Sequence, residues 1–342
     1  MTEEPSGLLA LLDRKTVAQI ALGFLVAVVV LGLFAVGIGV DEIRAALSGA
    51  QLEWLVLGCL STLLCLTAWG KAWQIVLRVA GVEESFRRLA VTYYAATFAN
   101  YVTPLGQAGG EPFIAYVLSR DTDASYEGAL ASVVTADLLN MLPFVTFSGV
   151  GFAALVYQSS LPAALEPLAA GLMGLAVGVP ALAAVGWRYR FSLGRLALRL
   201  AAPVARRTKR LGLEGLRERL RELNDAFQRI AQDRRALVSV LAFAYLGWLF
   251  FALPLYFAGL TIGRDLDLLL VLFIVPASTL AGLVPSPGGL GGVEAAMIAL
   301  LVGLLGVTTA TGYAVALIYR LASYWFALGL GGVAALYVIA RN

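Results

Sequence analysis

The sequence predicts an all-α polytopic membrane protein with six full spans plus two re-entrant hairpins in an inverted repeat. Three observations lead to this fold class. Hydrophobic residues make up 60% of the 342 residues and charged residues only 14%, whereas soluble domains are less apolar and more charged. Several apolar stretches exceed the roughly 18 residues that indicate a membrane-spanning helix. A short glycine-rich motif occurs twice, each time within an apolar stretch.

Six apolar stretches are long enough to cross a bilayer as single helices. They lie at about 16–38, 54–80, 125–157, 163–187, 236–260 and 308–340. The first is too long, and has the wrong flanking residues, for a cleaved signal peptide, so we expect it to be retained. The third and the last are long, which is consistent with tilt or with helix ends that protrude from the membrane.

Two further apolar segments, 86–120 and 266–306, are each broken midway. As helices, the two pieces of the first would rise only about 22 Å and about 12 Å, less than the roughly 30 Å of a hydrocarbon core. Irregular backbone at that depth is tolerated inside protein or beside a watery cavity. We therefore expect both segments to be re-entrant hairpins.

The charges of the loops predict the orientation of the spans. The loop 188–236 holds fourteen Arg and Lys residues against five Asp and Glu, a net charge of +9 in a chain whose total is +3. Such loops stay in the cytoplasm, which predicts a multi-pass protein of the cell membrane with cytoplasmic N- and C-termini. Apolar residues recur every three or four positions between 213 and 230, which predicts an amphipathic helix. We expect it to lie on anionic membrane lipids or to pack on the protein.

The glycine-rich motif reads TPLGQAGGE at Thr103–Glu111 and SPGGLGGVE at Ser286–Glu294. Both copies fit the pattern T/S-P-x-G-x-x-G-x-E, and they start 183 residues apart. Two copies in register, each breaking an apolar segment, indicate an internal repeat. In the predicted orientation the first hairpin is entered from the cytoplasm and the second from outside, so the repeat must be inverted.

The repeat divides the chain into a first membrane repeat, 1–160, and a second, 161–342, with the loop 188–236 as an insertion. Inverted repeats with interrupted helices are typical of transporters, whose site lies near the bilayer midplane. Helices that begin at the two breaks direct partial positive charge to that depth and favour an anion, such as a lipid phosphate. We expect Pro112 to stand in the first turn of one of these helices.

Three sequence strings together resemble the lysylphosphatidylglycerol synthase transmembrane (flippase-like) family. They are P-x-G-x-A-G-G-E-P in the first motif, PSPGGLGGVE in the second, and LIYRLASYW in the last span. The resemblance covers nearly the whole chain and implies a polytopic membrane protein associated with translocating charged lipids or lipid-linked sugars. Some family members are fused to a soluble aminoacyl-transfer domain. The sequence contains none, so we do not expect lysyl transfer.

Four ionisable residues are the main candidates for a substrate-binding site. Glu111 and Glu294 end the two motif copies, and Asp137 and Arg320 each follow 26 residues later, inside a predicted span. A charge at such a position costs roughly 3 kcal/mol and is functional by default. The expected site is completed by Gly106, Gly109, Gly110, Gln107, Gly289, Gly292, Asn100 and Asn140.

The roles of these four residues have alternatives. The glutamates can bind a headgroup amine, carry a proton or simply cap helices. Asp137 and Arg320 can form a structural ion pair that ties the halves together, or Arg320 can hold a phosphate whose charge Asp137 balances.

Two other functions remain open from the sequence. Asp121–Asp123 and Asp265–Asp267 match the D-x-D pattern of metal-bound sugar donors, so one alternative is an integral-membrane glycosyl- or aminoacyl-lipid transferase. The other is a small-solute secondary transporter. The chain has no histidine, which excludes His-based metal sites and proton relays. We expect a transporter rather than an enzyme, with a lipid or lipid-linked phosphate substrate, no metal, no cofactor and no nucleic-acid partner.

Overall fold

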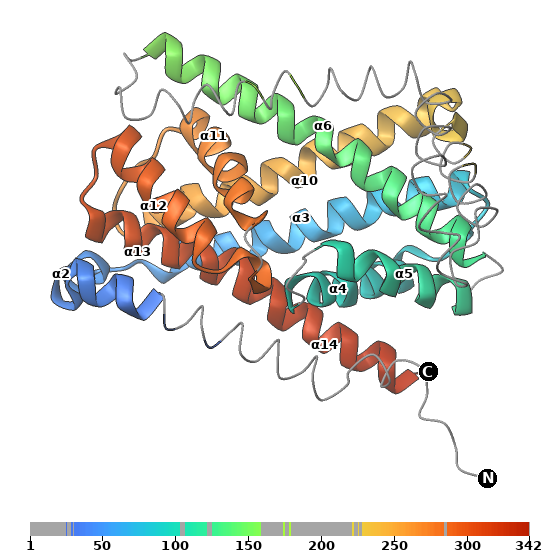
Figure 1. Ribbon diagram of the computed structural model, residues 1–342, viewed down its shortest axis with the longest axis horizontal. Coiled ribbons are helices and arrows are strands. Elements are labelled where there is room, and N and C mark those ends of the chain that lie inside the picture. Colours follow the sequence, from blue (N-terminus) through green and yellow to red (C-terminus); the bar gives the residue numbers. More distant parts are fainter. Residues whose placement is uncertain are drawn as a thin grey trace, which may run out of the picture. The chain divides into compact units, whose positions relative to one another are not determined.

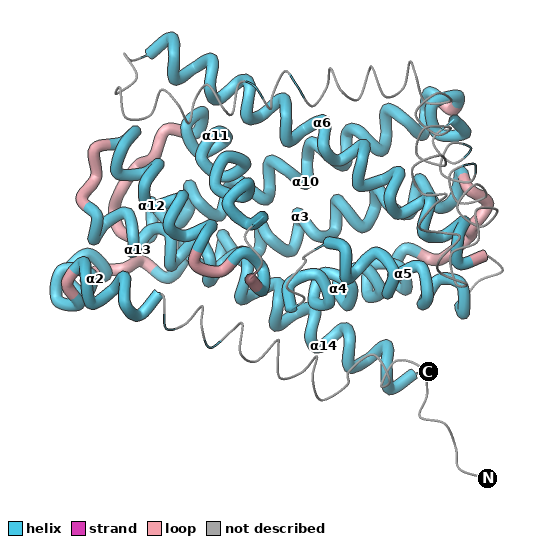
Figure 2. Tube along the Cα trace, in the orientation of Figure 1, coloured by secondary structure: helices cyan, strands magenta, loops and turns pink. Residues whose placement is uncertain are grey.

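The computed structural model describes residues 31–102, 107–121, 125–158, 228–283 and 286–341, together with a few isolated positions. All regular elements within these ranges are helices, so the predicted all-α fold class is confirmed (Figures 1 and 2). Most of the predicted spans 16–38 and 163–187 and most of the loop 188–236 lie outside the described residues.

Four of the predicted spans coincide with continuous helical runs. These are α3 (Leu52–Val79), α6 (Tyr126–Gln158), α10 (Arg234–Thr261), and α13 (Thr309–Arg320) joined by a π-helical turn (Leu321–Trp325) to α14 (Phe326–Arg341). α3 and α10 have 28 residues each, and such a helix rises about 42 Å, enough to cross a bilayer core. Among the described residues, five helices are long and apolar enough to do so.

The faces of α3 show why this helix suits a membrane. Leu52, Val56, Leu60 and Leu64 recur every four residues, and each is more than two-fifths exposed. Ser61 is buried instead, and its hydroxyl donates to the carbonyl of Phe250 at 2.8 Å. An exposed leucine stripe is unfavourable in water but neutral against lipid tails. The chain is therefore a multi-pass integral membrane protein.

The two interrupted segments consist of shorter helices. The first contains α4 (Phe86–Val102) and α5 (Gln107–Asp121). The second contains α11 (Leu268–Thr279), a 3-10 turn (Leu280–Leu283), a second 3-10 turn (Pro287–Gly289) and α12 (Gly292–Leu305). α4, α5 and α11 have fewer than the roughly 20 residues that a perpendicular span requires. The run Pro287–Leu305, which joins the second 3-10 turn to α12, has 19 residues and is the fifth helix long and apolar enough to cross a membrane. The assignment of the two segments as re-entrant hairpins stays a prediction.

The start of α5 differs from the expectation that Pro112 stands in the first turn of its helix. The helix begins at Gln107, and Pro112 is its sixth residue. A proline there lacks only the hydrogen bond to the carbonyl four residues earlier, which is that of Ala108. The helix accommodates this loss within its second turn.

The chain forms two compact units that do not follow the order of the sequence. The first comprises Met1–Leu66, Ala90–Phe113 and Leu249–Asn342, and the second Thr67–Leu89 and Ile114–Trp248. In the first unit, α12 packs against α11 and α13, and α2 (Val40–Leu47) packs against α13. The first unit contains the whole second motif copy. The division into repeats at residue 160 stays a prediction.

Candidate functional site

The second motif copy forms a tight turn between two helices of the first unit. The Ser286 hydroxyl donates to the Leu290 carbonyl at 3.0 Å, and the Leu290 N–H donates to the Pro287 carbonyl at 3.1 Å. Gly288 has φ +56°, a left-handed conformation that side chains disfavour. A β-carbon at Gly288 would also collide with the ring of Tyr324. Both constraints require glycine at this position.

Glu294 caps the helix that follows this turn. α12 begins at Gly292, and the Oε2 atom of Glu294 accepts the backbone N–H of Gly291 at 2.6 Å. An acidic side chain in the first turn satisfies an otherwise unpaired donor and complements the helix dipole. The residue is only 3% exposed. The capping role considered for the glutamates is therefore present at Glu294, although it uses only one carboxylate oxygen.

The other carboxylate oxygen binds Arg320, the last residue of α13. The Nε atom of Arg320 donates to Oε1 of Glu294 at 2.6 Å, and Nη2 donates to the carbonyl of Gly288 at 2.9 Å. Arg320 is 7% exposed. A guanidinium has five N–H donors, and within the described part of the chain these two bonds account for two of them. The remaining donors are on the two terminal nitrogens.

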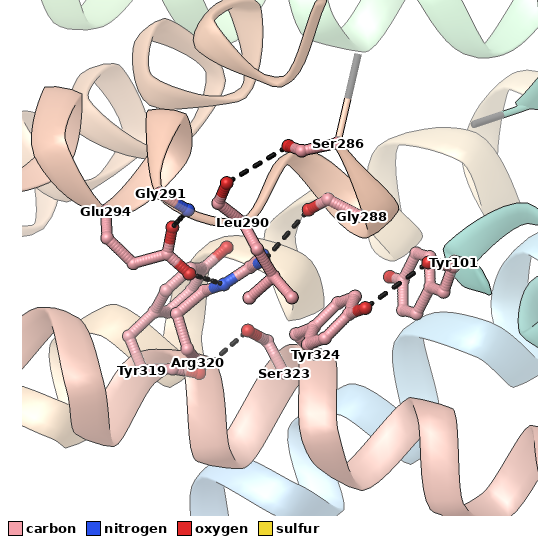
Figure 3. A network of polar contacts seen from close by, with 10 residues as sticks. All are labelled: Tyr101, Ser286, Gly288, Leu290, Gly291, Glu294, Tyr319, Arg320, Ser323 and Tyr324. Atoms are coloured by element: carbon pink, nitrogen blue, oxygen red, sulfur yellow. Dashed lines mark hydrogen bonds and ion pairs between the residues drawn. The ribbon is translucent and has the colours of Figure 1, made fainter. Parts of the chain in front are cut away.

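Aromatic side chains complete the surroundings of the ion pair (Figure 3). The Cζ atom of Arg320 lies 4.3 Å from the ring centroid of Tyr324, a cation–π distance. Tyr324 packs in turn against Tyr101 of α4, with ring centroids 4.9 Å apart, and its hydroxyl donates to the Tyr101 carbonyl at 3.3 Å. Leu290 and Tyr324 form a buried cluster against which Tyr101 packs.

The Arg320–Glu294 pair is electrically neutral, but its burial costs free energy. Moving two charges out of water carries a penalty of several kcal/mol per ion, which the mutual attraction offsets only with good geometry and further hydrogen bonds. Here the Gly291 N–H and the Gly288 carbonyl supply those bonds. Loss of one charge would leave the other buried without compensation, at a cost of about 3–5 kcal/mol. The site can therefore accept a new anion at Arg320 only if the charge of Glu294 is rebalanced.

The structure pairs Arg320 with Glu294, and a pairing of Arg320 with Asp137 stays an expectation. Asp137 lies on α6 in the second unit, where its Oδ1 atom accepts the indole N–H of Trp73 at 3.0 Å. Asn140 lies on the same helix, and its backbone carbonyl accepts the indole N–H of Trp248 at 2.9 Å. Its side-chain oxygen is buried and has no hydrogen-bond partner among the described residues.

The remaining predicted residues fall into two groups. Gly289 and Gly292 belong to the turn and to the first residue of α12. In the first motif copy, Gly106 lies outside the described residues, whereas Gln107, Gly109, Gly110 and Glu111 belong to α5 and Asn100 to α4. Glu111 and Asn100 are both half-buried.

Sequence reasoning missed the contributions of Gly288 and Tyr324. Gly288 was overlooked because the shared pattern leaves its position free, and the first copy has Leu105 there. Tyr324 is part of the string LIYRLASYW and stands four residues after Arg320. That spacing places two residues on one face of a helix, so Tyr324 could have been noted as a neighbour of the charge.

The D-x-D string at Asp265–Asp267 has a local structural role. Asp267 is the N-cap of α11, and its Oδ1 atom accepts the N–H groups of Leu269 at 2.7 Å and Leu270 at 3.3 Å. Asp121 of the other string is the last residue of α5. Among the described residues, no group of three or more acidic or cysteine side chains is arranged to hold a metal ion.

The chain is similar to several membrane proteins of archaea. A UPF0104 membrane protein of Pyrococcus horikoshii is 24% identical over 87% of this chain and 91% of its own length. Two UPF0104 membrane proteins of Methanothermobacter thermautotrophicus are 26% and 27% identical, and each alignment covers at least 93% of both chains. Residues 20–331 match the family described as the lysylphosphatidylglycerol synthase TM region. The chain belongs to this family, as its motifs indicated.

Proposed function

We propose that this protein moves a charged or phosphate-linked lipid, or a lipid-linked sugar, between the leaflets of the membrane. The observation that carries the proposal is the buried Arg320–Glu294 pair at a break between apolar helices. A chain that needed only to span lipid would not keep two charges there, because apolar residues of similar size are often as stable or more stable.

The chemistry of Arg320 suits a phosphate group. A guanidinium binds phosphate oxygens through two parallel N–H bonds, and it stays charged at any physiological pH. Two bonds to Glu294 and Gly288 leave donors on both terminal nitrogens. The Gly288 carbonyl fixes the plane of the guanidinium, so a phosphate would meet an oriented fork rather than a freely rotating charge.

Glu294 then acts as the internal substitute for the substrate's negative charge. With no lipid bound it neutralises Arg320 at 2.6 Å. When a phosphate arrives, the two anions share one guanidinium within a few ångströms, and such a pair repels strongly in a low dielectric. This repulsion is removed when Glu294 accepts a proton or binds a cationic part of the headgroup. The exchange keeps the site close to neutral throughout the crossing.

The first motif copy supplies the second side of the proposed site. Glu111, with Gln107 and the neighbouring glycines of α5, would meet the substrate in the complementary orientation of the transporter. Asp137 and Asn140 are proposed to contribute later on the path. Anionic lipids are the proposed partners of the basic loop 188–236, and the cytoplasmic position of both termini stays an expectation.

A matched series of variants tests the role of Arg320. Purified protein is placed in phosphatidylcholine–phosphatidylglycerol vesicles with an acyl-labelled fluorescent phosphatidylglycerol, and dithionite bleaches the label in the outer leaflet. Arg320→Met should abolish the protein-dependent loss of the protected fraction. Arg320→Lys should restore only part of it, because a point charge lacks the planar fork. Equal activity of both variants and the wild type would remove Arg320 from the mechanism.

The identity of the lipid needs a separate measurement. Native-lipid mass spectrometry of the wild-type protein should recover a phosphate-bearing lipid that is depleted in Arg320→Met. A divalent-metal requirement together with a covalently altered lipid would instead favour the transferase. Solute transport that is indifferent to added lipid would favour the small-solute transporter.

A further inference from the structure

Tyr324 contacts both interrupted segments of the fold at once. We propose that it is a positioning residue that couples the two breaks, so that movement of the Arg320 clamp at the second break is transmitted to the first. This inference rests on the proposed translocation function, because that function requires the two breaks to change together. It assigns a role to a tyrosine that binds no substrate itself.

The contact with the second break is steric and electrostatic. The Tyr324 ring occupies the space in which a side chain at Gly288 would lie. The same ring lies under the guanidinium of Arg320, whose Nη2 atom holds the Gly288 carbonyl. The turn at Gly288, the guanidinium of Arg320 and the ring of Tyr324 therefore each contact the other two. Displacing Arg320 removes both the bond to the turn and the charge above the ring.

The contact with the first break is made through the end of α4. The Tyr324 hydroxyl donates to the carbonyl of Tyr101, and the two rings are 4.9 Å apart. Tyr101 is the next-to-last residue of α4 and lies two residues before the start of the first motif copy. Carbonyls at a helix C-terminus have no partner within their own helix. The hydroxyl of Tyr324 therefore stabilises the point at which α4 stops.

The backbone around Tyr324 offers a way to release both contacts together. Residues Leu321–Trp325 form a π-helical turn, closed by the N–H of Phe326 donating to the carbonyl of Leu321. Such turns are rare, and they occur frequently at functional sites. A π turn contains one residue more than an α turn, so reverting to α geometry would rotate the following residues by about 100°. Because Tyr324 lies within the turn itself, such a change would redirect its side chain relative to Gly288 and Tyr101 at the same time.

Tyr313 of α13, in the helical run that also contains Tyr324, provides a matched control. The hydroxyl of Tyr313 donates to the carbonyl of Leu31 at 3.0 Å, which is also a bond from this helical run to the backbone of another segment. Tyr313→Phe and Tyr324→Phe therefore remove the same type of bond. Only the second removes a bond that joins the two breaks.

The experiment measures the coupling between the two breaks without measuring lipid transport. A single cysteine at Gln107 reports on the first break, in a background in which Cys59 and Cys65 are serine. The rate at which a maleimide modifies this cysteine is measured with and without the double change Arg320→Met/Glu294→Gln. The double change releases the second break and leaves no charge unpaired. With Tyr324 intact, we expect the double change to alter this rate about fivefold, the equivalent of one neutral hydrogen bond.

The proposal predicts that this effect persists in Tyr313→Phe and disappears in Tyr324→Phe and Tyr324→Leu. An unchanged fivefold effect in both Tyr324 variants would overturn it, and so would the absence of any effect in the intact background. Failure of the vesicle assay with the coupling present would instead count against the proposed function alone.

Discussion

Gly288→Ala is the change that most sharply separates the geometry of the site from general helix stability. The substitution forces an alanine into a conformation with φ +56°, which costs about 1–2 kcal/mol for an L-residue. It also drives a methyl group into the ring of Tyr324, and overpacking of this type costs about 1–3 kcal/mol more. We expect a total loss of roughly 2–5 kcal/mol in the free energy of unfolding.

Gly306→Ala is the matched control for this prediction. Gly306 follows the last residue of α12 and has φ +63°, but a β-carbon there would meet nothing within 4 Å. It should carry the conformational cost of about 1–2 kcal/mol alone. Thermal unfolding in detergent should therefore place Gly288→Ala below Gly306→Ala by the equivalent of about 1–3 kcal/mol. Gly288→Ala should also lose translocation per folded molecule, because the displaced ring no longer supports Arg320.

Equal unfolding temperatures and equal lipid transport in the two alanine variants would contradict this prediction. That outcome would mean that the turn around Gly288 moves aside at no cost. The contact between Gly288 and Tyr324 would then have no part in holding the guanidinium.

Three further predictions concern the ion pair, the orientation and the D-x-D string. Arg320→Met and Glu294→Gln should each destabilise the protein by about 3–5 kcal/mol, whereas the double variant should lose less than either, because no charge is left buried alone; additive losses in thermal unfolding would contradict this. A cysteine at Asp41 should react with an impermeant reagent from outside and one at Arg87 only after permeabilisation, and the reverse pattern would invert the topology. Asp267→Ala should lower stability by about 1 kcal/mol through loss of a helix cap, with no new dependence of activity on divalent metal.

The long spans were predictable from the sequence because a membrane imposes a simple length requirement. The prediction of 236–260 differs from α10 by only two residues at its start and one at its end. The second break was also predictable, since a cluster of glycine and proline within apolar sequence favours a turn, whereas Gly109, Gly110 and Pro112 of the first motif copy lie within α5. Arg320 could be identified by its charge alone, because an apolar segment rarely contains one.

The partner of Arg320 could not be predicted from the sequence, because it depends on the path of the turn. The spacing of the repeat gave Arg320 and Asp137 equivalent positions, and it did not show that the turn from Ser286 to Gly291 brings Glu294 to Arg320 of α13. The π-helical turn was also missed. The residues LASYW have no local property that distinguishes them from an ordinary helix, and the packing of Tyr324 against Leu290 within the turn is a tertiary contact.

The most direct test of the central claim is the rate at which the variant Arg320→Met/Glu294→Gln moves a fluorescent phosphatidylglycerol across reconstituted vesicles. The variant removes both charges, so it should fold and insert, and the amount of folded protein can be matched to the wild type. We predict that it leaves the inner-leaflet label protected from dithionite, as in vesicles without protein. Bleaching at the wild-type rate per folded molecule would contradict a mechanism in which Arg320 binds the phosphate of the crossing lipid.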